Sequence, residues 1–237
     1  MTAVFAHPDD ETYATGATLA RSSAQGVRCS LYCATDGDAG KTSGIPVSSP
    51  EELGRIRRAE LRAACAVLGV QRVDFGGHGD GKLAQADEQQ VMGEIVRLLR
   101  QEQPEVVLTF GPEGAPTQHR DHIAISSLTR RAIECAASDS EYPEQLMGTV
   151  RPHRVARLCV VTWPAPMPGD LYQAIGQPAH IRIDAGPWNG KKREAFLSHR
   201  SQRQANFERY ALVDAEWYCV AWGAAAPLNA EDLFSGL

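Results

Sequence analysis

Short apolar runs alternate with amphipathic stretches over the first two-thirds of the chain. Apolar runs of strand length occupy residues 2–6, 27–34, 73–76 and 106–110. Between and after them, apolar residues recur three and four positions apart, as in helices, at residues 12–25, 50–68, 88–102 and 119–137. Strands that alternate with helices are typical of a parallel sheet. We therefore expect an α/β fold, Rossmann-like, with helices on both faces of a mostly parallel sheet.

One helix carries clear signals at both ends. Ser49 is placed to cap it, Pro50 suits its first position, and Glu52 lies three residues after the cap. Gly69 is a typical C-terminal stop. These signals predict a helix over residues 50–68.

The pattern loosens beyond residue 143, where strands are predicted at 155–163, 179–183 and 218–222 and a helix at 188–202. No clear linker separates these elements from the rest of the chain. We expect a single domain over residues 1–237, in which a core (1–150) is followed by a C-terminal part (151–237) that completes the pocket.

Composition narrows the class of protein. Of 237 residues, 43 % are hydrophobic and 22 % charged, as in ordinary globular proteins. The net charge of −5, with both signs interspersed, argues against nucleic acid as a partner. No apolar run reaches the ~20 residues of a membrane span, and no apolar leader follows Met1. Six scattered cysteines fit a reducing compartment. We expect a cytoplasmic protein, and its assembly into a homo-oligomer is left open.

The first predicted strand ends in the motif Ala6-His7-Pro8-Asp9-Asp10-Glu11. In open α/β sheets, ligands bind at the carboxyl ends of strands, so this loop faces the expected site. An acidic loop that merely caps the following helix is the alternative. The histidine beside the carboxylates favours a metal site, because imidazole and carboxylate together suit zinc or iron.

A second motif, Gln118-His119-Arg120-Asp121-His122, follows the predicted strand at 106–110. If a helix begins near His119, then His119 and His122 share one of its faces. Three protein ligands and a water make an open, catalytic site, and a His/Asp set without cysteine favours that type. Spacing alone does not decide which of the two histidines binds the metal.

Together the two motifs resemble those of the LmbE/PIG-L family of metal-dependent de-N-acetylases. Three further segments resemble family landmarks: the R-x-x-E helix from Arg57 to Glu60, the glycine-rich segment 75–81, and the K-x-x-A-x-x-x-H-x-S-Q signature at 192–202. The resemblance spans residues 3 to 202. It implies removal of an acetyl group from an N-acetylglucosamine-type amino-sugar conjugate, a small-molecule substrate, with release of acetate and free amine.

The resemblance also implies the site residues. One divalent ion, Zn²⁺ in preference to Fe²⁺, would be bound by His7, Asp10 and His122. Asp9 would be the general base, and His119, tuned by Asp121, would stabilise the transition state. Physical chemistry agrees, because a metal polarises the amide carbonyl and a carboxylate beside the water can move its proton. A nearby Asp121 would favour the cationic form of His119.

Substrate contacts are less sharply indicated. Our candidates for substrate contacts are Arg57, Asp80 and His199. Each also has an explanation without a substrate: Arg57 could lie on a solvated helix face, Asp80 could be a turn residue, and His199 could be packed in the interior. The alternatives to a deacetylase are a metal-dependent phosphoesterase and a non-catalytic sugar-binding module. The sequence does not indicate the group attached to the amino sugar.

Overall fold

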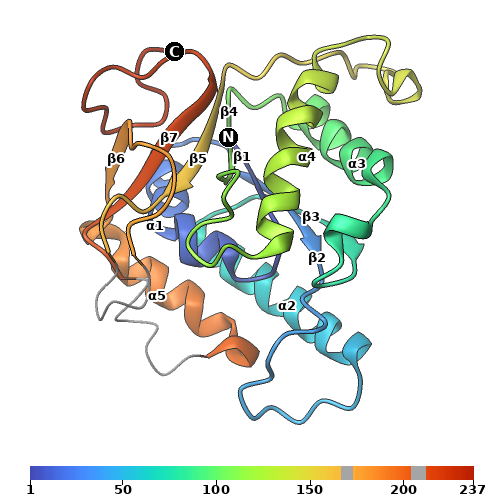
Figure 1. Ribbon diagram of the computed structural model, residues 1–237, viewed down its shortest axis with the longest axis vertical. Coiled ribbons are helices and arrows are strands. Elements are labelled where there is room, and N and C mark those ends of the chain that lie inside the picture. The colour runs from blue at the N-terminus through green and yellow to red at the C-terminus, as the bar shows by residue number, and fades with distance from the viewer. Residues whose placement is uncertain (167–172, 204–211) are drawn as a thin grey trace.

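The computed structural model describes residues 1–166, 173–203 and 212–237. Its strands form one seven-stranded sheet in the order β3-β2-β1-β4-β5-β7-β6 (Figure 1). The strands are β1 (Thr2–Phe5), β2 (Ser30–Thr35), β3 (Arg72–His78), β4 (Val106–Phe110), β5 (Arg157–Thr162), β6 (Ile181–Asp184) and β7 (Ala215–Gly223).

Five of these strands run parallel and two do not. β3, β2, β1, β4 and β5 pair in parallel, whereas β7 is antiparallel to both β5 and β6. The chain thus makes β6 before β7, yet β7 lies between β5 and β6. The fold class predicted from the hydrophobic pattern is confirmed, including its C-terminal strands.

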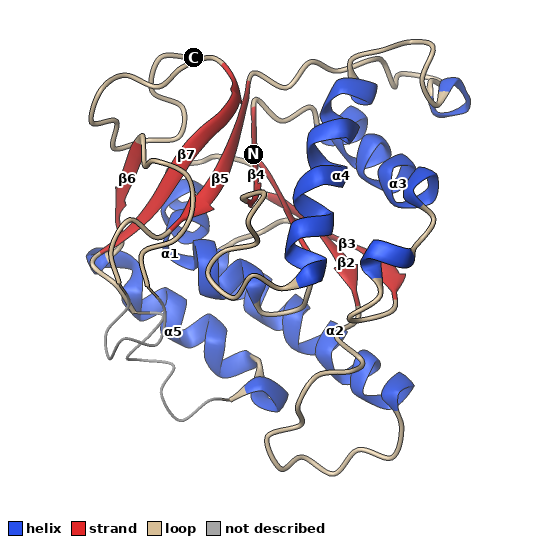
Figure 2. Cartoon of the chain, viewed as in Figure 1, coloured by secondary structure: helices blue, strands red, loops and turns tan. Residues whose placement is uncertain are grey.

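Helices cover both faces of the sheet (Figure 2). They are α1 (Asp10–Ala24), α2 (Pro50–Leu68), α3 (Glu88–Glu102), α4 (Arg120–Ala136) and α5 (Asn189–Ser198). α1, α2 and α5 pack on one another, and α3 packs on α4, so the helices form two layers. β1, β2, β4 and β5 are buried along their whole length, as strands covered on both faces must be.

The predicted capping of α2 is confirmed. The side chain of Ser49 accepts a hydrogen bond from the Glu52 backbone N–H at 3.3 Å, and Gly69 ends the helix at φ 77°. The helix predicted over 188–202 is shorter, because α5 ends at Ser198 and a 3-10 turn, Arg200–Gln202, follows it. β7 begins three residues before the predicted strand.

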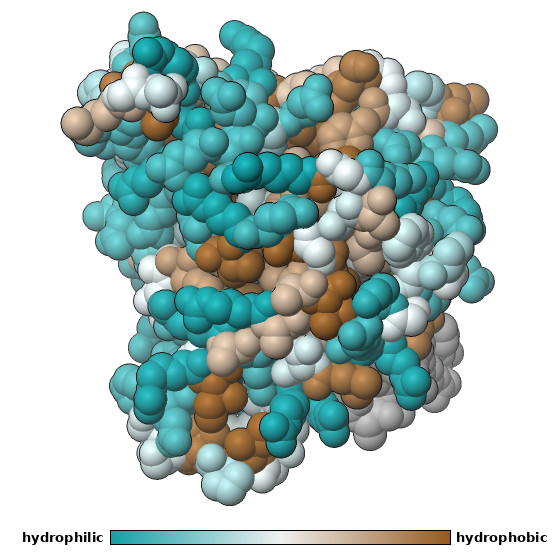
Figure 3. Space-filling view, turned by 180° about the vertical axis from the view of Figure 1, so that it is seen from behind, coloured by the Kyte–Doolittle hydropathy of each residue, from teal (hydrophilic) through white to brown (hydrophobic). Residues whose placement is uncertain are grey.

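Among the described residues, no helix is both long enough and apolar enough to cross a bilayer. From behind, apolar side chains form separate patches among hydrophilic ones (Figure 3). All six cysteines are free thiols, and Cys135 alone among them is not buried.

Candidate metal centre and active site

The two motifs meet at the carboxyl end of β1, where successive strands are added first on one side of β1 and then on the other. β1 lies between β2 and β4, and the loop after β1 and the loop after β4 both open at the carboxyl end of the sheet. Such a crevice is the usual ligand site of open α/β sheets. α1 begins there at Asp10, and α4 begins at Arg120 with His119 as its N-cap.

The side chains of His7, Asp10 and His122 form a compact triangle in this crevice. His7 Nδ1 lies 3.3 Å from His122 Nε2 and 3.4 Å from Asp10 Oδ2, and Asp10 Oδ1 lies 3.3 Å from His122 Nε2. Ligands at the usual ~2.0–2.1 Å from a tetrahedral zinc ion are roughly 3.3–3.4 Å apart. The donor set therefore fits a divalent metal.

His7 is fixed from its other side. Its Nε2 lies 3.1 Å from Asp80 Oδ1 and 3.3 Å from Asp121 Oδ2. Asp121 is itself anchored, because its carboxylate accepts hydrogen bonds from the backbone N–H groups of Gly81, at 2.7 Å, and Leu83, at 3.1 Å. A histidine that donates one ring N–H to a carboxylate keeps its other nitrogen free for a metal.

The Asp121 carboxylate is directed at His7 and two backbone donors rather than at the ring of His119. Its charge still raises the pKa of His119, as we expected, but other groups outweigh it. His119 Nδ1 instead accepts the backbone N–H of Asp121 at 3.2 Å. Burial, together with the rings of His7 and His122, lowers the pKa of His119. Because Nδ1 accepts this hydrogen bond, the ring N–H of His119 lies on Nε2 in this arrangement.

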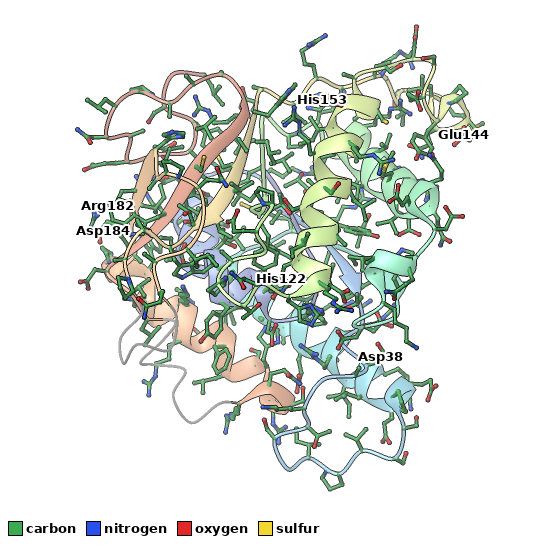
Figure 4. All side chains as sticks on the ribbon, viewed as in Figure 1. Asp38, His122, Glu144, His153, Arg182 and Asp184 are labelled. Atoms are coloured by element: carbon green, nitrogen blue, oxygen red, sulfur yellow. The ribbon has the colours of Figure 1, made fainter. Side chains whose placement is uncertain are left out.

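The ring of His122 is held by two residues that the sequence did not indicate. Phe110, the last residue of β4, stacks on it with centroids 3.8 Å apart and planes 9° apart. Thr117 Oγ1 lies 3.4 Å from His122 Nδ1. Figure 4 shows His122 at the N-terminal end of α4, in the middle of the molecule. Both contacts keep His122 Nε2 directed at His7 and Asp10.

Two other ligand groupings are present among the described residues. His7, His119 and His122 place ligand atoms within 4.8 Å of one another, and so do His7, Asp80 and Asp121. The second grouping is explained by the support of His7, because backbone donors already bind the Asp121 carboxylate. Both groupings depend on His7, so they describe one site rather than two.

Asp9 lies beside the triangle in a constrained backbone conformation. Its φ of 119° is in the left-handed region, which few residues other than glycine adopt. Its backbone N–H donates to Glu11 Oε2 at 3.0 Å, and its Oδ2 lies 3.2 Å from Arg57 Nη2. Burial raises the pKa of Asp9 to about 6, although the Arg57 charge opposes that shift. Asp9 can therefore exchange a proton near neutral pH.

Arg57 reaches Asp9 through a gap that only glycine leaves open. Its Nη1 donates to the Gly37 carbonyl at 2.9 Å, and its Nη2 also donates to the Pro8 carbonyl. A Cβ atom at Gly37 would lie 2.1 Å from Nη1, and one at Gly40 would lie 2.5 Å from it. Arg57 thus positions the loop of Asp9, and its buried Nε has no hydrogen-bond partner.

A cavity of about 290 Å³ opens above these groups. Of the three predicted substrate contacts, Arg57 and Asp80 line it. His199 does not line it and is fully buried, with its Nε2 hydrogen-bonded to Glu11 Oε1 at 2.9 Å. Our expectation for His199 is therefore wrong, because this histidine packs behind the loop of Asp9. Tyr13 and Trp163 line the cavity and were not indicated by any motif.

The charges around the triangle favour a cation. Burial opposes protonation of His7, but hydrogen bonds to Asp10, Asp121 and Asp80 raise its pKa well above the usual value. Burial likewise opposes ionisation of Asp10, but His122 and His7 hold the pKa of that carboxyl well below its usual range. The pocket thus stabilises positive charge at the point where the three donor atoms meet.

Comparison with known proteins agrees with this site. The family model for GlcNAc-PI de-N-acetylases (PIG-L) matches residues 2–133. A 1D-myo-inositol 2-acetamido-2-deoxy-alpha-D-glucopyranoside deacetylase from Rhodococcus jostii is 30 % identical, over 99 % of this chain and 97 % of that protein.

Solved structures show the same fold. An N,N'-diacetylchitobiose deacetylase from Pyrococcus horikoshii superposes with a TM-score of 0.75 at 21 % identity, covering 92 % of this chain and 82 % of that one. A 4-carboxy-2-hydroxymuconate hydratase from Pseudomonas putida superposes at 0.74 with 18 % identity, covering 97 % and 98 %. The fold is thus shared with a protein named for another reaction, and the sequence match carries the assignment: the chain belongs to the GlcNAc-PI de-N-acetylase (PIG-L) family.

Proposed function

We propose that this chain is a metal-dependent hydrolase that removes the N-acetyl group from an N-acetylglucosamine-type amino sugar and releases acetate and a free amine. The observation that carries the proposal is the triangle of His7, Asp10 and His122 with Asp9 beside it, all facing one cavity. The name of the Rhodococcus relative, a deacetylase of an acetamido sugar, supports the same reaction.

We assign the metal ligands to His7, Asp10 and His122, and the ion to Zn²⁺ in preference to Fe²⁺. Two imidazoles and one carboxylate at tetrahedral spacing suit zinc, and three protein ligands leave a position open. When bound, such an ion polarises the amide carbonyl and makes a water molecule more acidic.

The chain's own residues then move the protons. Asp9 accepts the proton of the attacking water and passes it to the departing amine nitrogen. Arg57 keeps the Asp9 carboxylate facing the cavity. His119 carries its proton on Nε2, because Nδ1 accepts a backbone N–H. It donates that hydrogen bond to the oxygen that gains charge when the amide is attacked.

Substrate contacts follow from the lining of the cavity. Asp80 has one carboxylate oxygen on His7, and its second oxygen would accept a hydrogen bond from a sugar hydroxyl. Arg57 lies in the same wall, but its guanidinium is held by the Gly37 and Pro8 carbonyls, so it would act on the substrate through Asp9. The substrate is a small amino-sugar conjugate. The free thiols support the cytoplasm as its place of action.

The two alternatives are less well supported. A phosphoesterase of the usual kind holds two metals, but both ligand groupings among the described residues need His7. A sugar-binding module would not need a carboxylate held at φ 119° by a buried arginine.

The test is metal analysis joined to a product assay. We expect about one divalent ion per chain, and equal amounts of acetate and amine from N-acetylglucosamine derivatives. A chelator should abolish both products, and added Zn²⁺ should restore them. Release of phosphate from phosphate esters, or no acetate from the metal-loaded protein, would refute the proposal.

A further inference from the structure

The backbone of Asp9 does not have the conformation that its place in the chain favours. Asp9 is the N-cap of α1, and an aspartate at an N-cap ordinarily has an extended backbone and accepts hydrogen bonds from the first N–H groups of the helix. Here φ is 119°, and the carboxylate accepts no hydrogen bond from the N–H groups of α1, all of which the structure describes. The carboxylate lines the cavity and contacts Arg57 instead. A conformation so unfavourable persists only where neighbouring groups hold it.

Glu11 holds the Asp9 backbone from inside the molecule. Its Oε2 accepts the Asp9 N–H at 3.0 Å, and its Oε1 accepts the Thr12 hydroxyl and lies 2.9 Å from His199 Nε2. Glu11 and His199 are almost fully buried, so solvent does not compete for these contacts. His199 Nδ1 has no hydrogen-bond partner among the described residues, so the polar anchor of this ring is Glu11.

The C-terminal signature that contains His199 also reaches the helix of Arg57. Ser201 donates its backbone N–H, at 2.8 Å, and its hydroxyl, at 2.6 Å, to the carboxylate of Glu60. Glu60 lies three residues after Arg57 on α2, and Arg57 binds the Asp9 side chain. α5 packs on both α1 and α2 (Figure 1). The contacts therefore form a ring that leaves the loop of Asp9 along α2 and returns to it through His199.

We propose that Glu11 and His199 are positioning residues for Asp9: they hold its backbone N–H, and so keep its carboxylate off the end of α1 and facing the cavity. Neither residue lines the cavity, so both act through Asp9 rather than on the substrate. The C-terminal signature thus contributes to the reaction from behind the site. This inference rests on the proposed function, because it takes Asp9 as the general base.

The first test does not depend on turnover. Crystal structures of the metal-loaded wild type and of Glu11→Ala would show the Asp9 backbone directly. In the variant we expect Asp9 to leave the left-handed region, and its carboxylate to accept the N–H groups at the start of α1, as at an ordinary N-cap. An Asp9 that keeps both its φ and its contact with Arg57 in this variant overturns the proposal.

The second test compares two replacements of His199 in the metal-loaded enzyme. His199→Gln keeps an N–H donor for Glu11, whereas His199→Met fills a similar volume without one. Because a misplacement of about 1 Å can cost about 10²-fold in rate, kcat of His199→Met should fall about 10–100-fold. KM and metal content should stay near those of the wild type, and His199→Gln should recover most of the loss. Equal values of kcat in the two variants contradict the proposal.

Lys192→Met is the matched control for damage to the fold. Lys192 belongs to the same signature and forms a buried ion pair, but its partner is Glu216 rather than Glu11. The variant should unfold at a lower urea concentration than the wild type and still keep kcat within about twofold. If Lys192→Met loses as much kcat as His199→Met, the loss follows from stability and the proposal fails.

A double-mutant cycle with the base completes the design. In the Asp9→Asn background, His199→Met should lower kcat by less than about threefold, because the base that it positions is already lost. A further loss of about 10–100-fold in that background would overturn the proposal. A wild type that releases no acetate, while Glu11→Ala still frees the Asp9 backbone, retains the positioning role and refutes the proposed reaction instead.

Discussion

The parallel and antiparallel parts of the sheet contribute differently to the site. The segments that follow β1 and β4 supply the metal ligands and the base, packed so tightly that donor atoms are 3.3–3.4 Å apart. Arg57 from α2 and Asp80 from the loop after β3 support them. The antiparallel part and its surroundings supply the walls of an adjoining cavity: Trp163 after β5, Arg182 on β6, Trp217 on β7, and an ion pair between Lys192 of α5 and Glu216 of β7. The family match ends at residue 133, before β5 begins. We infer that the segments after β1 and β4 carry the proposed reaction, whereas the antiparallel part shapes the wall beside them.

The largest expected effect is loss of a ligand. His122→Ala should leave the chain folded but largely free of metal, and should lower kcat/KM by about 10⁴-fold or more because the carbonyl is no longer polarised. Metal content by mass spectrometry, together with acetate release, checks this. Full metal occupancy in the variant would indicate that His119, which is grouped with His7 and His122, is the ligand instead.

Next is the base. Asp9→Asn keeps its size and its contact with Arg57 but cannot accept a proton, so kcat should fall about 10²–10⁴-fold while metal content and KM stay near those of the wild type. Asp10→Asn is the matched neighbour, and its main defect should be metal loss that excess metal partly repairs. If the two variants exchange these phenotypes, then the two roles are exchanged.

A smaller effect is expected at Asp121, which contacts the proposed metal ligand His7. Asp121→Asn weakens the hold on His7 Nε2, and the affinity for metal should fall about 10–100-fold. Competition with a chelator of known affinity measures this change. Glu94→Gln serves as the control, because Glu94 also binds a histidine, His78, but outside the cavity. An equal loss of metal affinity in both variants contradicts the specific role of Asp121.

The smallest effect on the reaction is expected in the antiparallel part. Lys192→Met leaves Glu216 buried without its cation and should lower the free energy of unfolding by about 3 kcal/mol. The value of kcat should stay within about twofold of the wild type, because Lys192 does not line the cavity that holds the reacting groups. Lys191→Met, at the exposed neighbouring lysine, should cost less than about 0.5 kcal/mol. Urea unfolding measures both variants, and a large fall in kcat for Lys192→Met would break the division between the two regions.

Local signals explain why the first region was largely predictable. The bounds of α2 and α3 follow from Ser49 and Asp87, whose side chains cap nearby backbone N–H groups. The meeting of the two motifs was expected because both follow strands that end at the same edge of the sheet. The choice of His7, Asp10 and His122 as ligands was implied by the family resemblance. The contact of Asp121 with His7 was not predicted, because the two residues are 114 positions apart along the chain.

The second region had no such signals. Trp163 follows β5, Arg182 lies on β6 and Trp217 on β7, and they face one adjoining cavity because β7 pairs with both β5 and β6. His199 was recognisable within a motif, but the motif did not indicate that its ring would bind Glu11 behind the site. Residues that act through tertiary contacts leave little pattern in a single sequence.

The position of β7 has a consequence for synthesis on the ribosome. His7 and His122 can meet once the first half of the chain has emerged, because they are 115 residues apart and both lie ahead of β5. β5, by contrast, keeps an unpaired edge until the last of the seven strands arrives between it and β6. A nascent chain therefore passes through a stage that has its metal ligands but an open sheet edge. Such edges pair readily with other chains, so this stage is the one most exposed to aggregation.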